Sequence, residues 1–199
     1  MRTISEEAAL IYRWTDVYRK LFSKTPDLSV LAIPAKPEGL GPMRLIVVAK
    51  EIVEWTNGRQ LQRTMDALKR TFQFRCSQFA GDLDTSITVN DRDPRNGSYA
   101  LWVKDVREAD EENANRSVND LKAVNHQGLT VLERMLLEAD YFFEHGEHLD
   151  YENSTLCGGS RSSDGVHVPY VNWNGRQFDL GCAEIKHGDR LLRSRTVYL

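Results

Sequence analysis

The stretch from Thr130 to Gly146 constrains the fold of this chain more than any other segment. Thr130 and Glu133 match the capping box, in which two side chains bind otherwise unpaired backbone amides at the start of a helix. Apolar residues then recur at three- and four-residue spacing from Leu132 to Phe143, and Gly146 favours a left-handed stop. The pattern predicts a long helix with a wide apolar face, which other elements must bury.

Short β-like runs follow that helix, and further elements precede it. The later runs cover residues 154–157, 167–173, 177–182 and 193–198, the earlier ones cover 45–49 and 99–103, and a helical pattern covers 58–74. Asn174-Gly175 adds a hairpin signal. Because regular βαβ alternation is missing, we predict the α+β class, with a mainly antiparallel sheet packed against two or three helices and a C-terminal β-meander. A chain of 199 residues suits one compact domain.

The N-terminal segment has a helical pattern of its own. Apolar and aromatic residues from Leu10 to Phe22 follow one helix face, Ser5 can cap the start, and Pro26 ends the segment. We therefore expect residues 1–26 to form an amphipathic helix whose stripe packs in the core, with a docking arm as the alternative. Residues 43–199 are expected to form the α+β domain.

Charge and cysteine content narrow the classes of function. A formal net charge of -3 gives no general attraction for polyanions, so nucleic acid is not an expected partner. Cys76, Cys157 and Cys182 form no C-x-x-C pair, so neither a disulfide framework nor a structural zinc site is predicted, and Cys157 is expected to be buried and inert. The sequence has no signal peptide pattern and no membrane-length apolar run, which predicts a cytoplasmic protein without a membrane partner.

The segment from Cys157 to Gly165 carries the main functional hypothesis. Gly158, Gly159 and three serines lie around Arg161, and such loops can cradle an anion with backbone amides and hydroxyls. Ser160, Arg161 and Asp164 are therefore candidate ligand-binding residues. No Gly-Lys-Ser/Thr follows and the flanks have strand patterns, so a P-loop is not predicted, and an ordinary polar hairpin loop is the alternative.

Three further arginines are candidates for the same ligand. Arg193 and Arg195 point to one side if this segment is extended, and two guanidinium groups there could bind carboxylate or phosphate. A charged edge strand that discourages aggregation is the alternative. Arg92 lies in an aspartate-rich loop and would bind phosphate beside a metal.

That loop also contains candidate metal ligands. Asp91 and Asp93 form an Asp-x-Asp pair that could hold Mg²⁺ or Mn²⁺, since hard cations favour oxygen ligands. Turn chemistry, in which aspartate binds its own backbone, is the alternative. His145 and His148 could share a metal if the helix continued, but Gly146 between them predicts that the helix ends.

Four stretches carry a resemblance to known sequences. They are N-D-R-D-P-R-N-G-S-Y-A from Asn90, V-R-E-A-D-E-E from Val106, L-T-V-L-E-R from Leu129 and T-L-C-G-G-S-R-S-S-D-G from Thr155. In these stretches the chain resembles a family of uncharacterised bacterial proteins, over roughly residues 44–199. That family has no established function, so the resemblance assigns no functional residue.

Taken together, these patterns contain no complete acid–base or nucleophile set. The leading hypothesis is a non-enzymatic binding or interaction domain for an anionic small molecule or a protein partner. The alternatives are a Mg²⁺- or Mn²⁺-dependent hydrolase or phosphotransfer enzyme built on Asp91 and Asp93, and a structural subunit of an oligomer. The sequence leaves cofactors, enzymatic activity and oligomeric state open.

Overall fold

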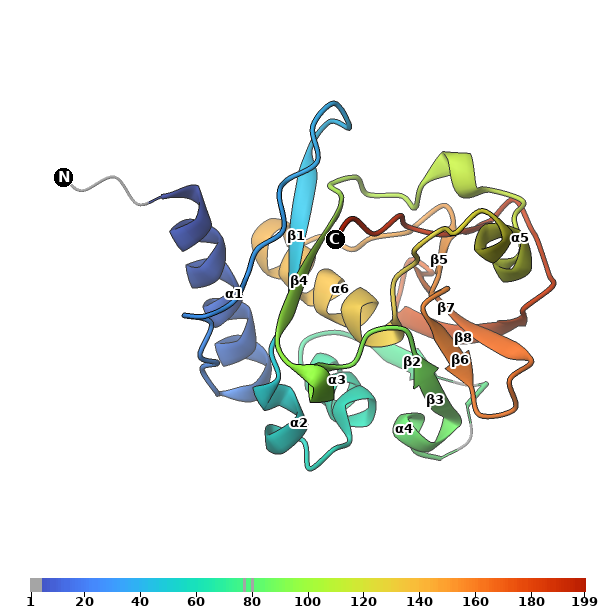
Figure 1. Ribbon diagram of the computed structural model, residues 1–199. Helices are drawn as coiled ribbons and strands as arrows, with labels where there is room; N and C mark the ends of the chain where they lie inside the picture. The colour runs from blue at the N-terminus through green and yellow to red at the C-terminus, as the bar shows by residue number, and fades with distance from the viewer. Residues whose placement is uncertain (1–4, 77, 80) are drawn as a thin grey trace.

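The computed structural model describes residues 5–76, 78–79 and 81–199, and the chain in these ranges forms six α-helices, two 3-10 helices and nine strands (Figure 1). In chain order the elements are α1 (Glu6–Phe22), β1 (Met43–Val48), α2 (Glu51–Trp55), α3 (Gln60–Leu68), β2 (Phe74–Cys76), α4 (Leu83–Ser86), β3 (Ile87–Asn90), η1 (Pro94–Asn96), β4 (Tyr99–Lys104), η2 (Glu111–Asn113), α5 (Val118–Ala123), α6 (Val131–His145), β5 (Ser154–Leu156), β6 (Ser160–Ser162), β7 (His167–Trp173), β8 (Phe178–Glu184) and β9 (Leu192–Arg193). One compact unit of helices and mainly antiparallel sheets confirms the predicted α+β class.

The described strands form three open sheets. β1 pairs with β4 and β3 pairs with β6, both antiparallel, and a five-stranded sheet has the order β2-β8-β7-β5-β9. Within the larger sheet β5, β7 and β8 are antiparallel neighbours and form the predicted C-terminal meander. β2 and β9 join its two edges in parallel, which the sequence pattern did not indicate.

Helix α6 is the central element, lying between the β1–β4 pair and the larger sheet (Figure 1). Thr130 and Glu133 form both bonds of the predicted capping box, and Gly146 ends the helix at a φ of 67°. Every residue from Val131 to Asp140 is buried, so the first ten residues of α6 are enclosed on all sides.

Helix α1 packs into the same core. The Trp14 indole donates a hydrogen bond to the carbonyl of Leu45 at 3.1 Å, and the Tyr18 hydroxyl bonds the Val47 carbonyl at 3.2 Å and the Ala49 amide at 2.8 Å. These side chains satisfy backbone groups along the outer edge of β1. The core role predicted for the aromatic stripe is confirmed, while the docking arm stays a prediction.

The predicted helix over residues 58–74 is shorter than expected. α3 ends at Leu68, and the chain enters β2 at Phe74. A separate helix, α2, precedes it, and the break between them falls at Asn57 and Gly58, which have φ values of 51° and 75°. Left-handed backbone at consecutive residues cannot continue a helix, which separates α2 from α3.

The acidic stretch at residues 107–125 contributes a short helix to the packed interior. Ser117 and Asp120 form a capping box that starts α5, and this short helix buries Val118 and Leu121 against the larger sheet. Its partners there include Leu156 and Val168. Glu111 and Glu112 are exposed, whereas Asp110 is buried and accepts a hydrogen bond from the amide of Thr196 at 2.8 Å.

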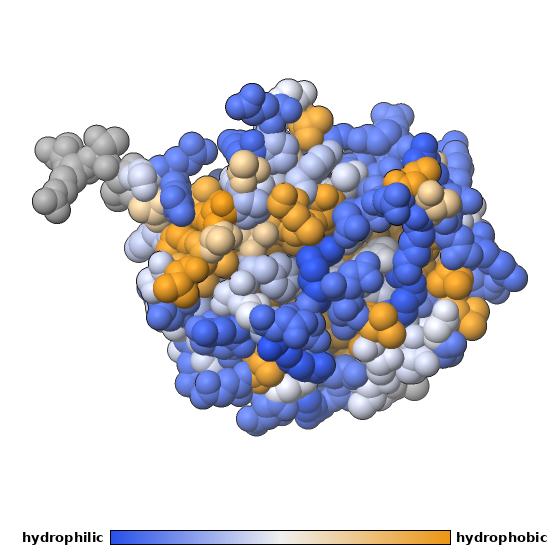
Figure 2. All heavy atoms as spheres, in the orientation of Figure 1, coloured by the Kyte–Doolittle hydropathy of each residue, from blue (hydrophilic) through white to orange (hydrophobic). Residues whose placement is uncertain are grey.

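The face of the molecule drawn in Figure 2 has an uneven distribution of apolar surface. Figure 2 shows apolar side chains gathered on the α1 side of one face and polar side chains over most of the rest. Leu10, Ile33 and Trp102 line a groove of about 280 Å³ beside the start of α1. Among the described residues, no helix combines the length and the apolar character needed to cross a membrane.

Candidate functional site

The structure brings two of the predicted loops together. The amide of Asp91 donates to the carbonyl of Gly159 at 2.8 Å, and the Ser160 hydroxyl donates to the Asn90 side-chain oxygen at 2.6 Å. β3 and β6 pair directly beside these contacts. The aspartate-rich loop and the glycine–serine loop are therefore neighbours, although 70 residues separate Asn90 from Ser160.

The amides of the glycine–serine loop are already occupied. Gly158 donates to Leu156, Gly159 to Leu129 and Ser160 to Cys157, each at 2.9 Å. The Ser160 hydroxyl also accepts from the amide of Val131, the first residue of α6, at 3.0 Å. The three amides are thus unavailable to an anion, and the Ser160 hydroxyl holds the start of α6.

Arg161 lies in strand β6, within the segment predicted to be a loop, and it has unused donors. Its side chain is buried, with 9% of the residue exposed, and Nη1 donates to the carbonyls of Gly158 and Ser160 at 2.5 and 2.6 Å. Nη2 is shielded from solvent, and within the described part of the chain it has no hydrogen-bond partner. Burial lowers the pKa of Arg161, and the opposing charge of Asp91 does not restore it.

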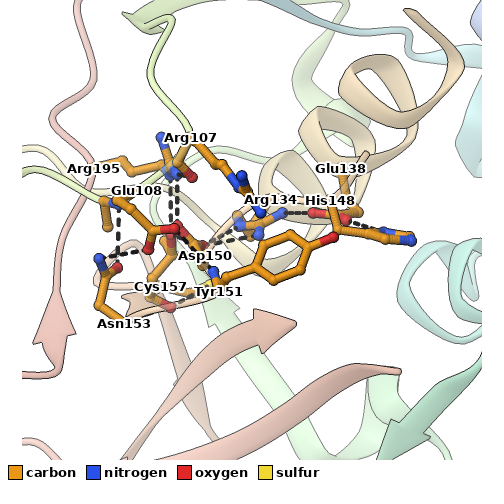
Figure 3. A network of polar contacts seen from close by, with 12 residues as sticks. Arg107, Glu108, Arg134, Glu138, His148, Asp150, Tyr151, Asn153, Cys157 and Arg195 are labelled. Atoms are coloured by element: carbon orange, nitrogen blue, oxygen red, sulfur yellow. Dashed lines mark hydrogen bonds and ion pairs between the residues drawn. The ribbon is translucent and has the colours of Figure 1, made fainter. Parts of the chain in front are cut away.

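Two other buried arginines share one carboxylate (Figure 3). Arg134 on α6 and Arg195 near the C-terminus reach Asp150 at 2.9 and 2.6 Å, and Arg134 also pairs with Glu138 at 2.8 Å. Burial alone would lower the pKa of Arg134, but the charges of Asp150 and Glu138 outweigh it and raise the pKa. Burial likewise acts to raise the pKa of Asp150, and the two arginines bring it below its usual range.

Arg44 is a further buried arginine that pairs with carboxylates of the chain. It contacts the carboxylates of Asp105 and Asp140, both at 2.7 Å, and its pKa is raised although burial opposes this. The buried arginines Arg44, Arg134 and Arg195 therefore each hold a carboxylate. Across residues 5–76, 78–79 and 81–199, Arg161 makes no such pair.

Arg92 was predicted to bind the ligand and is instead occupied within the fold. Its Nε and Nη2 donate to the two carboxylate oxygens of Glu133 at 2.7 and 2.9 Å, and Nη2 also bonds the carbonyl of Gly128 at 2.6 Å. Tyr99 donates to the same Glu133 at 3.0 Å. Glu133 belongs to the capping box of α6, so Arg92 fixes the start of that helix.

Arg193 and Arg195 occupy different environments. Arg195 is 1% exposed and lies in the buried network of Asp150, whereas Arg193 is partly exposed and its Nε bonds the carbonyl of Arg190 at 3.3 Å. Within the described residues β9 ends at Arg193, which removes the strand that was expected to orient the pair. The structure does not bring these two guanidinium groups to one surface.

Asp164 organises the β6–β7 turn. It accepts hydrogen bonds from the Ser162 hydroxyl at 2.5 Å, from the Val166 amide at 2.8 Å and from His167 Nδ1 at 2.6 Å. These bonds, led by that of Ser162, hold the pKa of Asp164 well below its usual range. Asp164 and His167 also line an open recess of about 600 Å³, together with Cys182.

The predicted metal ligands have local roles. Asp93 caps η1 by accepting from the amide of Arg95 at 2.8 Å and also bonds its guanidinium at 3.2 Å, which is the predicted turn chemistry. The backbone amide of Asp91 donates a hydrogen bond to the carbonyl of Gly159. In the described ranges, no three His, Cys, Asp or Glu side chains are grouped so as to hold a metal ion. A metal role for this pair stays a prediction.

Sequence reasoning missed the charged residues of α6. Arg134 and Glu138 lie four residues apart, and His148 joins them through a 2.8 Å contact between its Nδ1 and Glu138, while its ring stacks on Trp173. The i,i+4 spacing of Arg134 and Glu138 was a visible signal of an ion pair, but nothing local indicates that the pair is buried. Cys157 is fully buried and burial raises the pKa of its thiol to about 12, as expected for an inert cysteine.

Among the described residues of the predicted loops, these contacts leave one buried guanidinium that makes no ion pair with a carboxylate, that of Arg161. Comparison with protein-family models, curated proteins and solved structures found no match for this chain. The functional proposal therefore depends on the geometry around Arg161.

Proposed function

We propose that this protein is a non-enzymatic binding domain that holds the anionic group of a small molecule at Arg161. The single observation that carries the proposal is the buried guanidinium of Arg161, whose hydrogen bonds within the described residues all run from Nη1 to backbone carbonyls. Burying a charge is costly unless an opposite charge pairs with it. The other buried arginines meet that requirement with carboxylates from the chain itself. An anion from the ligand would do the same for Arg161.

The strand opposite Arg161 supports a binding role. Ile87 pairs with Ser162 and Val89 pairs with Arg161, so Thr88 is an extra residue and β3 contains a bulge at this point. Bulges redirect side chains and are frequent beside functional sites. Val89 is half exposed, which places the bulged strand at the surface next to the guanidinium.

Thermal denaturation tests the proposal. The protein is heated with and without millimolar phosphate, nucleotides and carboxylates, at constant ionic strength. A ligand that binds only the folded state raises Tm, and at 100 times its Kd it adds roughly 2.7 kcal/mol to the free energy of unfolding. We expect at least one anion to raise Tm in the wild type and to have no effect on Arg161→Met.

Arg176→Met is the control, because it removes the same charge from an exposed arginine outside the predicted site. The control variant should keep the full rise in Tm. If no anion raises Tm, or if the rise is the same in Arg161→Met, then Arg161 only braces its own loop and the proposal is wrong.

A further inference from the structure

The donors that Arg161 leaves free have a definite shape. The two N–H groups of Nη1 donate hydrogen bonds to the carbonyls of Gly158 and Ser160, and these bonds fix the orientation of the planar guanidinium. The remaining donors are Nε and Nη2, and the described residues give neither of them a hydrogen-bond partner. Nε–H and one N–H of Nη2 are parallel and lie on one edge of the group.

This chain repeatedly uses that edge to bind carboxylates. Arg13 contacts the two oxygens of Asp140 with Nε and Nη2, at 2.5 and 2.6 Å. Arg92 contacts Glu133 in the same way, at 2.7 and 2.9 Å. Two parallel donors match the two oxygens of a carboxylate, so the edge selects a planar group with two acceptors.

The charge around Arg161 favours a monoanion. Arg92, in the neighbouring loop, is already neutralised by Glu133. Asp91 adds a negative charge beside the loop, where its amide binds Gly159. A phosphate carries about 1.5 to 2 negative charges at pH 7 and three strong acceptors. The loop offers no further positive charge for it, and the amides of Gly158, Gly159 and Ser160 are all used.

We propose that the ligand group held by Arg161 is a carboxylate, bound side-on to the Nε–Nη2 edge, and not a phosphate. This inference rests on the proposed function and specifies its ligand class. Because Nη2 is enclosed, binding requires a local opening around Arg161, which pairs with Val89 of the bulged strand β3.

The test is an NMR titration of the full chain with sodium acetate and, separately, with inorganic phosphate, at pH 7 and with chloride holding the ionic strength constant. We expect acetate to bind the wild type about ten-fold more tightly than phosphate, a difference that corresponds to losing one charged hydrogen bond. Arg161→Lys keeps the charge but has no fork, so it should weaken acetate binding by about ten-fold. Asp91→Asn removes a negative charge that repels phosphate more strongly than acetate. It should therefore strengthen phosphate binding and narrow the difference between the two affinities.

The outcomes separate this inference from the proposed function. If phosphate binds as tightly as acetate or more tightly, and binding is lost in Arg161→Met, the binding domain stands and the carboxylate assignment is wrong. If acetate binds Arg161→Lys as well as it binds the wild type, the fork geometry is wrong. If neither anion depends on Arg161 in any variant, both proposals fail. The Tm of each variant without anion shows that it is folded.

Discussion

Asp150 offers a direct test of the buried charge network. It is fully buried, and it holds Arg134 and Arg195 at 2.9 and 2.6 Å (Figure 3). Its φ is 59°, in the left-handed region, where asparagine is tolerated and alanine costs about 1 to 2 kcal/mol. Asp150→Asn therefore removes the charge while keeping the size and the backbone conformation.

The expected loss follows from what the substitution leaves behind. Arg134 keeps Glu138, but Arg195 keeps only neutral partners, Thr155 and two backbone carbonyls. Breaking a buried ion pair by removing one partner costs about 3 to 5 kcal/mol, because the other charge stays buried. For a chain of this size that loss corresponds to a fall in Tm of about 6 to 20 °C.

Urea denaturation at pH 7 measures the difference in the free energy of unfolding. Asp179→Asn is the matched control, because Asp179 pairs with the exposed Arg75 and should lose less than about 1 kcal/mol. The lowered pKa of Asp150 means that its stabilisation is present above the unfolded pKa of about 3.9 and is lost as pH falls through the lower folded pKa. The wild type should therefore approach the variant in stability in acid. A loss below 1 kcal/mol at pH 7 would refute this reasoning.

Three further predictions concern the core and the loops. Tyr18→Phe leaves two buried backbone groups of the β1 edge unsatisfied and should cost about 1 to 3 kcal/mol in urea denaturation, and no loss would contradict the edge role of α1. Gly159→Ala places a Cβ 2.9 Å from the carbonyl oxygen of Gly128 and should cost about 1 to 3 kcal/mol, whereas Gly158→Ala meets its nearest atom at 4.0 Å and should have little effect; equal losses would disprove the close contact. The Cys157 thiol, with its pKa raised to about 12, should resist a thiol reagent at pH 8 until urea unfolds the protein. Because Cys76 and Cys182 are partly exposed, peptide mapping locates the modification, and rapid modification of Cys157 in the native state would contradict its burial.

The local elements of this fold could be predicted because their signals are contiguous in the sequence. The capping box at Thr130 and the stop at Gly146 define α6 without reference to any other part of the chain. The strand pattern at residues 167–173 likewise matches β7. Helix α2 was not predicted, and the helix predicted over residues 58–74 extended past Leu68, where α3 ends.

The charged core could not be predicted for a tertiary reason. Arg134 and Glu138 have the spacing of an exposed ion pair on a helix, and their burial depends on coverage by segments distant in the sequence. Arg195 arrives from the C-terminus to share Asp150, and no local pattern records that contact. Periodicity describes one face of a helix, so it cannot describe a helix that is enclosed on all sides.

In the candidate site, too, the sequence predicted the local feature and not the tertiary contacts. Glycine and serine around Arg161 identified the loop from its sequence. Which donors remain free depends on contacts with Leu129 and the carbonyls of Gly158 and Ser160. In those contacts the amides of Gly158, Gly159 and Ser160 bind carbonyls of the chain itself. The Nε–Nη2 edge of Arg161 is then the part of the segment that is free to bind a ligand.

The most direct test of this account observes that edge itself. In a ¹H–¹⁵N spectrum of the arginine side chains, the Nε–H signal of Arg161 is followed during a titration with acetate, with the signals of Arg134 and Arg195 as internal references. We expect the Arg161 signal to shift in a saturable way while the two reference signals stay fixed, since Asp150 and its neighbours already occupy those arginines. A signal from Arg161 that does not move at any acetate concentration, or that moves only in step with the references, would contradict the claim that the free edge of Arg161 binds an anion.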